Sequence, residues 1–131
     1  MANKKIFYTD MAPKPKGPYS QAVIHNGLLY VSGQIPVDPV IGTLIHGTIE
    51  EETELVLENL KIIVEEAGAS MEDVLKVTCY LADMDDFARF NDVYRKYFPE
   101  NPPARATVQA ARLPLDVQIE IDAIVALPAK T

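Results

Sequence analysis

Two alternating segments near the carboxyl end of the chain carry the residues with the clearest chemical potential. In residues 104–110, alanine and valine alternate with polar side chains that include Arg105, and in residues 117–123, valine and isoleucine alternate with Glu120 and Asp122. An arginine can hold a carboxylate through two parallel hydrogen bonds, and a glutamate can accept a proton from water. Charges of opposite sign on two neighbouring segments therefore permit either an ion pair or a site for a small polar ligand.

A period of two predicts that both segments are half-buried strands. If their apolar sides face one core, Arg105, Thr107, Glu120 and Asp122 share the other face of the sheet. If residues 111–116 form a simple hairpin, Thr107 stands opposite Glu120 and Arg105 opposite Asp122. The structural interpretation is a cross-strand ion pair, which contributes a few tenths to about 1 kcal/mol. The functional interpretation is a ligand site, and the alternation alone does not choose between them.

Turn and capping signals predict the elements that position these strands. Asn26-Gly27 lies between two apolar runs, which is typical of a tight hairpin. Thr48 followed by Glu51 forms a capping box, so an amphipathic helix is predicted from there to Gly68. The hairpin and the helix together account for most of the first half of the chain.

The next two elements are a strand and a second helix. The strand spans residues 75–81, where Leu75, Val77, Cys79 and Leu81 alternate as a core face. The single cysteine is therefore expected to be a core thiol. Asp83 is the predicted N-cap of the helix, which ends at Pro99. Its apolar side is aromatic: Phe87, Phe90, Tyr94 and Phe98.

The predicted order is β-β-β-α-β-α-β-β in a single domain spanning residues 1–131. Two helices can cover one face of a mostly antiparallel sheet, which places the chain in the α+β class. The other face mixes polar and apolar side chains: Leu28, Tyr30, Ser32, Thr78, Tyr80, Arg105, Thr107, Glu120 and Ile124. Such a face predicts packing against another subunit, and pockets tend to form at such boundaries.

Three further positions are candidates for a binding site, each with a plain structural alternative. Tyr19 in the segment GPYSQA is either a packed aromatic or a ring presented to a pocket. Gly33, after Ser32, marks either a bulge or a close approach to the backbone. Asn91 lies at the rim of the aromatic side of the second helix, where it is either a surface residue or a donor and acceptor for a ligand.

Composition excludes several classes of function. A net charge of −7 opposes binding to phosphate backbones, so a nucleic-acid partner is not expected, and the short basic segment 14–16 is interpreted as a solvated loop. Cys79, His25 and His46 form no recognisable set of metal ligands. No apolar run approaches the roughly 18 residues of a membrane span, and the first residues lack a secretory signal. We therefore expect no metal, no membrane partner and a cytoplasmic location.

Six motifs carry a resemblance to a known family. They are GPYSQA (17–22), YVSGQIP (30–36), VTCYLADM (77–84), FNDVYRKYFP (90–99), PARATV (103–108) and IEIDAIV (119–125). In this order, and over nearly the full chain, they resemble the reactive intermediate deaminase family, subfamily A (RidA), also known as YjgF/YER057c/UK114.

The resemblance implies a chorismate-mutase-like fold with six short strands in a mixed sheet, assembled as a homotrimer with sites between subunits. It also implies hydrolysis of 2-imino acids, such as 2-iminobutanoate and 2-iminopropanoate, to 2-oxo acids and ammonia without a cofactor. In this fold the strand at residues 75–81 can lie between the two charged strands. The hairpin pairing would then fail, and the shared face would remain.

Carried over by position, the resemblance implies that Arg105 binds the substrate carboxylate and that Glu120 handles the attacking water. The remaining pocket positions, contributed by more than one subunit, are Tyr19, Ser32, Gly33, Asn91 and Thr107. Many members have a cysteine where this chain has Thr107, so a thiol nucleophile is excluded here. Asp122 becomes a supporting or surface charge.

Two alternatives compete with the deaminase interpretation. One is a chorismate-mutase-like enzyme, which shares the implied fold and also uses charged groups between subunits. The other is a non-enzymatic trimer that senses metabolites or regulates translation. The motifs at residues 103–108 and 119–125 favour the deaminase over the mutase, and the acidic composition opposes direct contact with RNA.

Overall fold

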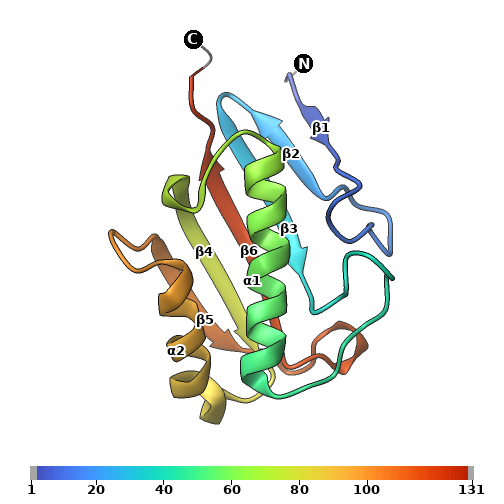
Figure 1. Cartoon of the computed structure of the whole chain (residues 1–131), viewed down its shortest axis with the longest axis vertical. Coiled ribbons are helices and arrows are strands. Elements are labelled where there is room, and N and C mark those ends of the chain that lie inside the picture. Colours follow the sequence, from blue (N-terminus) through green and yellow to red (C-terminus); the bar gives the residue numbers. More distant parts are fainter. Residues whose placement is uncertain (1–2, 130–131) are drawn as a thin grey trace.

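The computed structural model describes residues 3–129, in which two helices pack on one face of a six-stranded sheet (Figure 1). The strands are β1 (Lys5–Phe7), β2 (Ala22–His25), β3 (Leu28–Gln34), β4 (Val74–Leu81), β5 (Ala104–Gln109) and β6 (Ile119–Ala126). The helices are α1 (Ile49–Glu66) and α2 (Phe87–Tyr97), with short 3-10 turns at Met71–Asp73, Met84–Asp86 and Pro114–Asp116. The predicted α+β class and order of elements are confirmed.

Local sequence signals explain the first hairpin and the first helix. Asn26 and Gly27 both have positive φ, 51° and 76°, which is the conformation that a two-residue turn between twisted strands requires. The Thr48 hydroxyl accepts from the Glu51 amide at 3.1 Å, and the Glu51 carboxylate accepts from the Thr48 amide at 2.9 Å. This capping box starts α1, and Gly68, at φ 94°, follows its end.

The core lies between the helices and the sheet. Leu57, Leu60 and Ile63 of α1 are fully buried, as are Val77 of β4 and Ile121 of β6. Figure 1 shows α1 lying across the middle strands and α2 beside it over β4 and β5. Burial of these aliphatic side chains supplies the main driving force for holding the helices on this face.

The predicted hairpin between the two charged strands is wrong, because β4 lies between them. The sheet order is β1-β2-β3-β6-β4-β5, so within residues 3–129 β5 pairs with β4 alone and occupies an edge. The β4–β5 pair is parallel, whereas the other pairs are antiparallel. A parallel neighbour requires a crossover rather than a tight turn, and α2 provides that crossover.

The predicted shared face of Arg105 and Glu120 is also wrong. Arg105 pairs with Val77 of β4, so Arg105 and Thr107 point to the face that the helices cover. Glu120 pairs with Tyr80 and points to the opposite, open face. The alanines of β5 therefore lie on the open face, although they form the more apolar side of that strand. Alanine side chains bury little area, so their pattern carries little information about which face is covered.

Two smaller predictions also need correction. Leu75 does not join the core face of β4: the register shifts between Val74 and Lys76, so Val74 is buried and Leu75 is 48% exposed. A bulge of this kind inserts one residue and reverses the alternation at that point. Asp83 caps the 3-10 turn at Met84–Asp86, where its side chain accepts from the Asp85 amide, and α2 itself begins after Asp86.

The open face of the sheet has no helix over it in the described part of the chain. It presents side chains from all of the central strands: Tyr30, Ser32, Thr78, Tyr80, Glu120, Asp122 and Ile124. Tyr30 is 41% exposed, which is unusual for a large aromatic residue on the middle of a sheet. No helix within residues 3–129 is both long and apolar enough to span a membrane.

Candidate active site

The predicted site residues fall into two groups that the fold separates. We call Tyr19, Ser32, Gly33 and Glu120 the acid group, and Asn91, Arg105 and Thr107 the arginine group. The acid group is assembled from the N-terminal loop, β3 and β6, around the open face of the sheet. The arginine group is assembled from α2 and β5, on the covered face. One chain therefore brings each group together but not the two groups.

Contact between Gly33 and Glu120 defines the acid group. A side-chain carbon added at Gly33 would lie 2.8 Å from Cδ and 3.0 Å from Cγ of Glu120, and it would also collide with Oε2. The β3–β6 register shifts between Val31 and Gln34, so a bulge marks the position of Gly33. Both predicted roles for this glycine, a bulge and a close approach to the backbone, are confirmed. What approaches is the carboxylate of Glu120.

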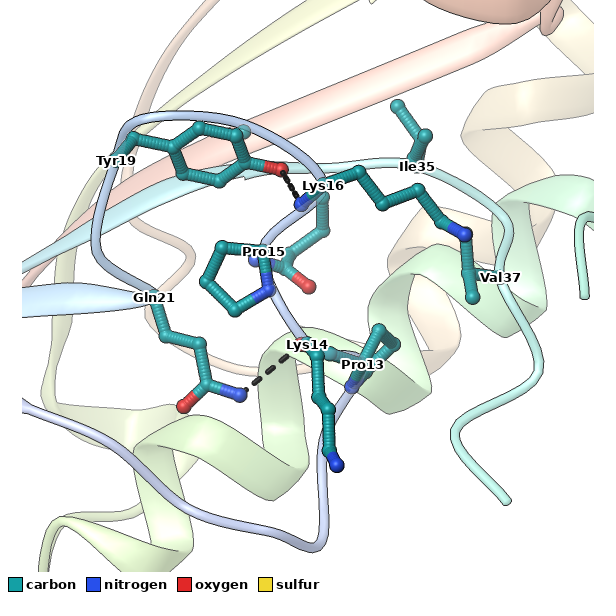
Figure 2. Close-up of a pocket in the computed structure, with 10 residues that line it drawn as sticks. Pro13, Lys14, Pro15, Lys16, Tyr19, Gln21, Ile35 and Val37 are labelled. Atoms are coloured by element: carbon teal, nitrogen blue, oxygen red, sulfur yellow. Dashed lines mark hydrogen bonds between the residues drawn. The ribbon is translucent and has the colours of Figure 1, made fainter. Parts of the chain in front are cut away.

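Tyr19 is held at the edge of this group by the folded N-terminal loop. Its hydroxyl accepts from the Lys16 amide at 3.2 Å, and the buried amide of Gln21 donates to the Pro13 carbonyl at 3.0 Å (Figure 2). The Ser32 hydroxyl donates to the Ser20 carbonyl at 2.5 Å, which fixes the loop to β3. Half of Tyr19 is exposed. The ring is therefore presented to a surface hollow rather than packed in the core.

That hollow has a volume of about 620 Å³ and contains the whole acid group. Its lining comprises Lys16, Tyr19, Ser32, Gly33, Ile35, Pro114, Leu115 and Glu120. Leu115 and Asp116 both have a φ of 56°, which is strained for residues with a side chain. Sequence reasoning placed residues 111–116 in a turn but did not identify Leu115 as a pocket residue, since nothing in its type marks a left-handed conformation.

The electrostatic surroundings of Glu120 favour a proton acceptor. Burial, and then the negative charge of Asp122, raise the pKa of the Glu120 carboxyl above its ordinary value. Asp122 itself accepts a hydrogen bond from the Tyr80 hydroxyl at 3.3 Å. A carboxylate with a raised pKa is a stronger base than a solvated one, and enzymes use this effect in general base catalysis.

Glu52 supports the acid group, although sequence analysis did not single it out. It is 1% exposed, and its carboxylate accepts from the Gln118 amide at 2.9 Å, the Gln118 side chain at 2.6 Å and the Gly47 amide at 3.2 Å. These bonds fasten the start of β6, two residues before Glu120, to the first turn of α1. The first turn of α1 contains three glutamates, and only the tertiary fold shows which of them is buried.

Arg105 is the centre of the arginine group and is enclosed by aromatic rings. Its guanidinium carbon lies 4.6 Å from the ring centre of Tyr94, 5.3 Å from that of Phe90 and 5.5 Å from that of Phe87. Nη1 donates to the Asn91 side-chain oxygen at 2.8 Å. Asn91 thus contacts Arg105 rather than solvent alone. Cation–π contacts and one fixed hydrogen bond hold the guanidinium in place while leaving other N–H donors available.

The arginine group borders a second hollow, of about 700 Å³. Its lining comprises Asn91, Tyr94, Arg95, Phe98, Pro99, Pro102, Pro103 and Arg105. Thr107 lies two residues beyond Arg105 on the same face, and its hydroxyl oxygen is buried without a hydrogen-bond partner among the described residues. Cys79, beside Thr107 in β4, is fully buried, and burial raises the pKa of its thiol to about 12. This thiol is therefore a core group, as predicted, and is not a nucleophile.

Chemically, the two groups offer complementary functions. The arginine group can bind an anion, and the acid group can accept a proton beside an exposed aromatic ring. Within residues 3–129, no set of three or more histidine, cysteine, aspartate or glutamate side chains is placed to hold a metal ion.

Comparison with known proteins decides the family. The family model described as Endoribonuclease L-PSP matches residues 9–127. The chain belongs to this family. The resemblance to the RidA family, drawn from the six motifs, is thereby confirmed, because the proteins similar to this chain include ones named Reactive Intermediate Deaminase A and RidA.

The family relatives align over nearly the whole chain. A RutC family protein of Pyrococcus abyssi is 54% identical over 121 residues, covering 92% of this chain and 95% of the relative. The chloroplastic Reactive Intermediate Deaminase A of Arabidopsis thaliana is 43% identical over 124 residues, covering 95% of this chain and 66% of the relative. The crystal structure of E. coli TdcF with bound serine superposes with a TM-score of 0.89 at 42% identity, covering 95% of this chain and 99% of TdcF.

Proposed function

We propose that this protein is an imine deaminase that hydrolyses 2-imino acids, such as 2-iminobutanoate and 2-iminopropanoate, to 2-oxo acids and ammonia. The observation that carries the proposal is the pair of groups described above: an arginine prepared for a carboxylate, and a glutamate with a raised pKa beside a hollow. Membership in a family that includes a protein named Reactive Intermediate Deaminase A supports the same chemistry.

The active site is proposed to lie between subunits of a homotrimer. A small imino acid cannot contact Arg105 and Glu120 of the same chain, because these residues point to opposite faces of the sheet. Arg105 of one subunit and Glu120 of the next can meet if the open face of one sheet packs beside the β5 edge of its neighbour. A head-to-tail contact of this kind closes into a ring when the rotation between neighbouring copies divides a full turn evenly. The family resemblance implies that this ring contains three subunits.

Few catalytic groups are needed for this reaction, because the protonated C=N carbon is already electrophilic. Arg105 orients the substrate by holding its carboxylate with two N–H donors. Glu120 accepts a proton from water as the water oxygen attacks the imine carbon. The resulting tetrahedral intermediate carries a hydroxyl and an amino group on one carbon. Glu120 then passes the proton to the nitrogen and becomes a carboxylate again. As the C–N bond breaks and ammonia leaves, Glu120 accepts the hydroxyl proton, and the C=O bond of the 2-oxo acid forms; that proton is finally lost to the released ammonia as ammonium.

The other proposed roles concern the shape of the pocket. Tyr19 supplies an apolar wall, the absence of a side chain at Gly33 leaves the backbone open to the substrate, and Asn91 fixes Arg105. Ser32 positions the Tyr19 loop through its bond to Ser20. Thr107 lines the pocket without acting as a nucleophile, and direct attack by water needs no cofactor.

The proposal is tested with Arg105→Ala and Glu120→Gln in an assay that couples a pyridoxal-phosphate-dependent dehydratase to disappearance of the imine signal. Arg105→Ala is expected to abolish the acceleration of imine hydrolysis. Glu120→Gln is expected to retain ligand binding and to turn over the imine more slowly. Arg89→Ala serves as the control, since Arg89 is an exposed arginine of α2 that pairs with Glu50 at 2.7 Å. Full activity in either site variant would remove that residue from the mechanism.

Mixing the two impaired variants tests the position of the site between subunits. When Arg105→Ala and Glu120→Gln chains are unfolded together and reassembled in equal amounts, one boundary in four joins an intact Arg105 to an intact Glu120. Activity is then expected to return to about a quarter of the wild-type value. No recovery in correctly assembled mixed trimers, measured by light scattering, contradicts a shared site.

RNA cleavage is the competing function, because the matched family model carries an endoribonuclease description. A net charge of −7 argues against it, since RNA binding depends on clustered basic residues. Salt-sensitive RNA binding by the purified trimer, abolished in Arg105→Ala, would favour the RNA-directed function over the deaminase.

A further inference from the structure

Two buried hydroxyl groups lie on the elements that surround Arg105. The hydroxyl oxygens of Tyr94 and Thr107 are both buried, and neither has an oxygen or nitrogen partner among the described residues. The neighbouring Cys79 thiol offers Thr107 a weak hydrogen bond at most. Buried polar groups in native proteins are nearly always paired, so each exception calls for a missing partner. Thr53 Oγ1 and Asn59 Oδ1 of α1 are also unpaired, but of these four atoms only those of Tyr94 and Thr107 belong to the elements that hold Arg105, so one ligand bound to Arg105 can serve both.

Packing does not explain why position 94 is a tyrosine. Tyr94 is 6% exposed and packs between Phe90 and Phe98 in tilted arrangements, with ring centres 5.6 Å and 4.8 Å away. The other three aromatic positions of this stripe of α2 are phenylalanines, whose rings make the same contacts without burying an oxygen. A phenylalanine at position 94 would fit the stack and avoid the cost of an unpaired hydroxyl.

The ring of Tyr94 also makes the nearest aromatic contact to the guanidinium, with the guanidinium carbon 4.6 Å from its centre. The phenol oxygen belongs to the same rigid ring and therefore lies in the immediate surroundings of Arg105. Burial raises the pKa of this phenol, so it remains a hydrogen-bond donor at neutral pH. Tyr94, Asn91 and Arg105 border the same hollow, and Thr107 lies on the same face of β5 as Arg105.

We infer that Tyr94 is a further substrate-binding residue, whose hydroxyl, together with that of Thr107, donates to the carboxylate that Arg105 holds, directly or through one bridging water. This inference rests on the proposed function and deepens it. The site accepts a planar anion that pairs with the guanidinium and supplies acceptors to two hydroxyl donors. The free energy lost by removing these hydroxyls from water is then offset by hydrogen bonds mainly in the complex with ligand.

The inference predicts opposite effects on stability and on binding. Removing a buried hydroxyl that has no partner leaves the free protein equally stable or more stable, whereas removing a donor to a bound carboxylate weakens the complex. Tyr94→Phe and Thr107→Val are expected to show an unchanged or higher melting temperature. Their affinity for 2-oxobutanoate, measured by titration calorimetry, is expected to fall about tenfold each.

Tyr97→Phe is the matched control on the same helix. The Tyr97 hydroxyl donates to the Glu58 carboxylate at 2.6 Å, at a position away from the arginine group. This variant is expected to lose stability and to keep the affinity for 2-oxobutanoate. Tyr97→Phe should therefore lower stability and leave affinity unchanged, whereas Tyr94→Phe should leave stability unchanged or higher and lower affinity. This difference separates a structural hydroxyl from a ligand-binding one.

Arg105→Ala distinguishes failure of this inference from failure of the proposed function. Suppose that the wild-type protein binds 2-oxobutanoate and that Arg105→Ala loses this binding. If Tyr94→Phe then keeps full affinity, the inference about Tyr94 is wrong, but Arg105 remains the carboxylate-binding residue. If Tyr94→Phe lowers the stability of the trimer without changing affinity, the partner of the hydroxyl is the neighbouring subunit, and the inference is again wrong. If wild-type protein shows no binding, or Arg105→Ala retains it, both fail.

Discussion

Gly33→Ala is the substitution that most directly tests the geometry of the acid group. The new methyl carbon would lie 2.8 Å from Cδ and 3.0 Å from Cγ of Glu120. Carbon atoms in favourable contact are about 3.5–4.0 Å apart, so the Glu120 carboxyl must move by roughly 1 Å. Gly33 does not have a positive φ, and the alanine backbone itself is therefore unstrained.

The free energy of unfolding is expected to change little in this variant. Turning the Glu120 side chain away from its preferred rotamer costs about 0.5–1.5 kcal/mol. Replacing glycine by alanine at an unstrained position restricts the unfolded chain and returns about 0.4–1 kcal/mol. The two effects nearly cancel, so the melting temperature should remain close to that of the wild type.

Turnover is expected to fall much further, because a displacement of about 1 Å in a reacting group can reduce the rate on the order of 100-fold. The assay is imine hydrolysis under saturating substrate, with thermal unfolding measured in parallel. Gly27→Ala is the control: its φ of 76° makes an alanine strained, and no atom lies within 4 Å of the added carbon. That variant should lose stability and keep turnover. Wild-type turnover in Gly33→Ala would refute the assignment of Glu120 as the water-handling group.

Three other predictions concern buried charges and the thiol. Glu52→Ala should lower the free energy of unfolding by about 3 kcal/mol in a denaturant titration, because the N–H donors of Gln118 and Gly47 lose their buried carboxylate acceptor. Glu54 is exposed on the same helix, so the control variant Glu54→Ala should change the free energy of unfolding little. Glu120→Gln should raise the melting temperature at pH 7. The raised pKa of Glu120 means that its charged form opposes folding, and the difference should disappear below a pH of about 4, where the carboxyl is protonated in both states. Equal melting temperatures of Glu120→Gln and wild type at pH 7 would contradict the raised pKa. Cys79 should react with a thiol-specific chromogenic disulfide only after unfolding, because it is buried with a pKa of about 12; rapid labelling of the native protein would show that β4 opens locally.

Local signals predicted the elements well because they depend on residues close together in the chain. The capping box of Thr48 and Glu51 and the turn at Asn26-Gly27 are satisfied by their own backbone neighbours, whatever the rest of the fold does. The alternation of β6 was also informative, since its isoleucines at 119 and 121 are large enough for burial to decide their face.

The same reasoning failed for β5, where the apolar side consists mainly of alanine. The face of Arg105 was decided instead by two tertiary features: the parallel pairing of Val77 with Arg105, and the aromatic rings of α2 that enclose the guanidinium. Neither can be read from residues 104–110 alone. The prediction that Leu75 lies on the core face of β4 failed for a related reason. A single inserted residue shifts the register of a strand and changes which side chains point to the core.

The sequence by itself determined which chemical groups are present, the family to which they belong and the order of the elements that carry them. Tertiary structure decided where those groups point, and it placed Arg105 and Glu120 on opposite faces of one sheet. It also identified Glu52 as buried and Tyr94 as a neighbour of Arg105. The physical reason is that residue type fixes chemistry, whereas strand register and helix packing, which join residues distant in the chain, fix position.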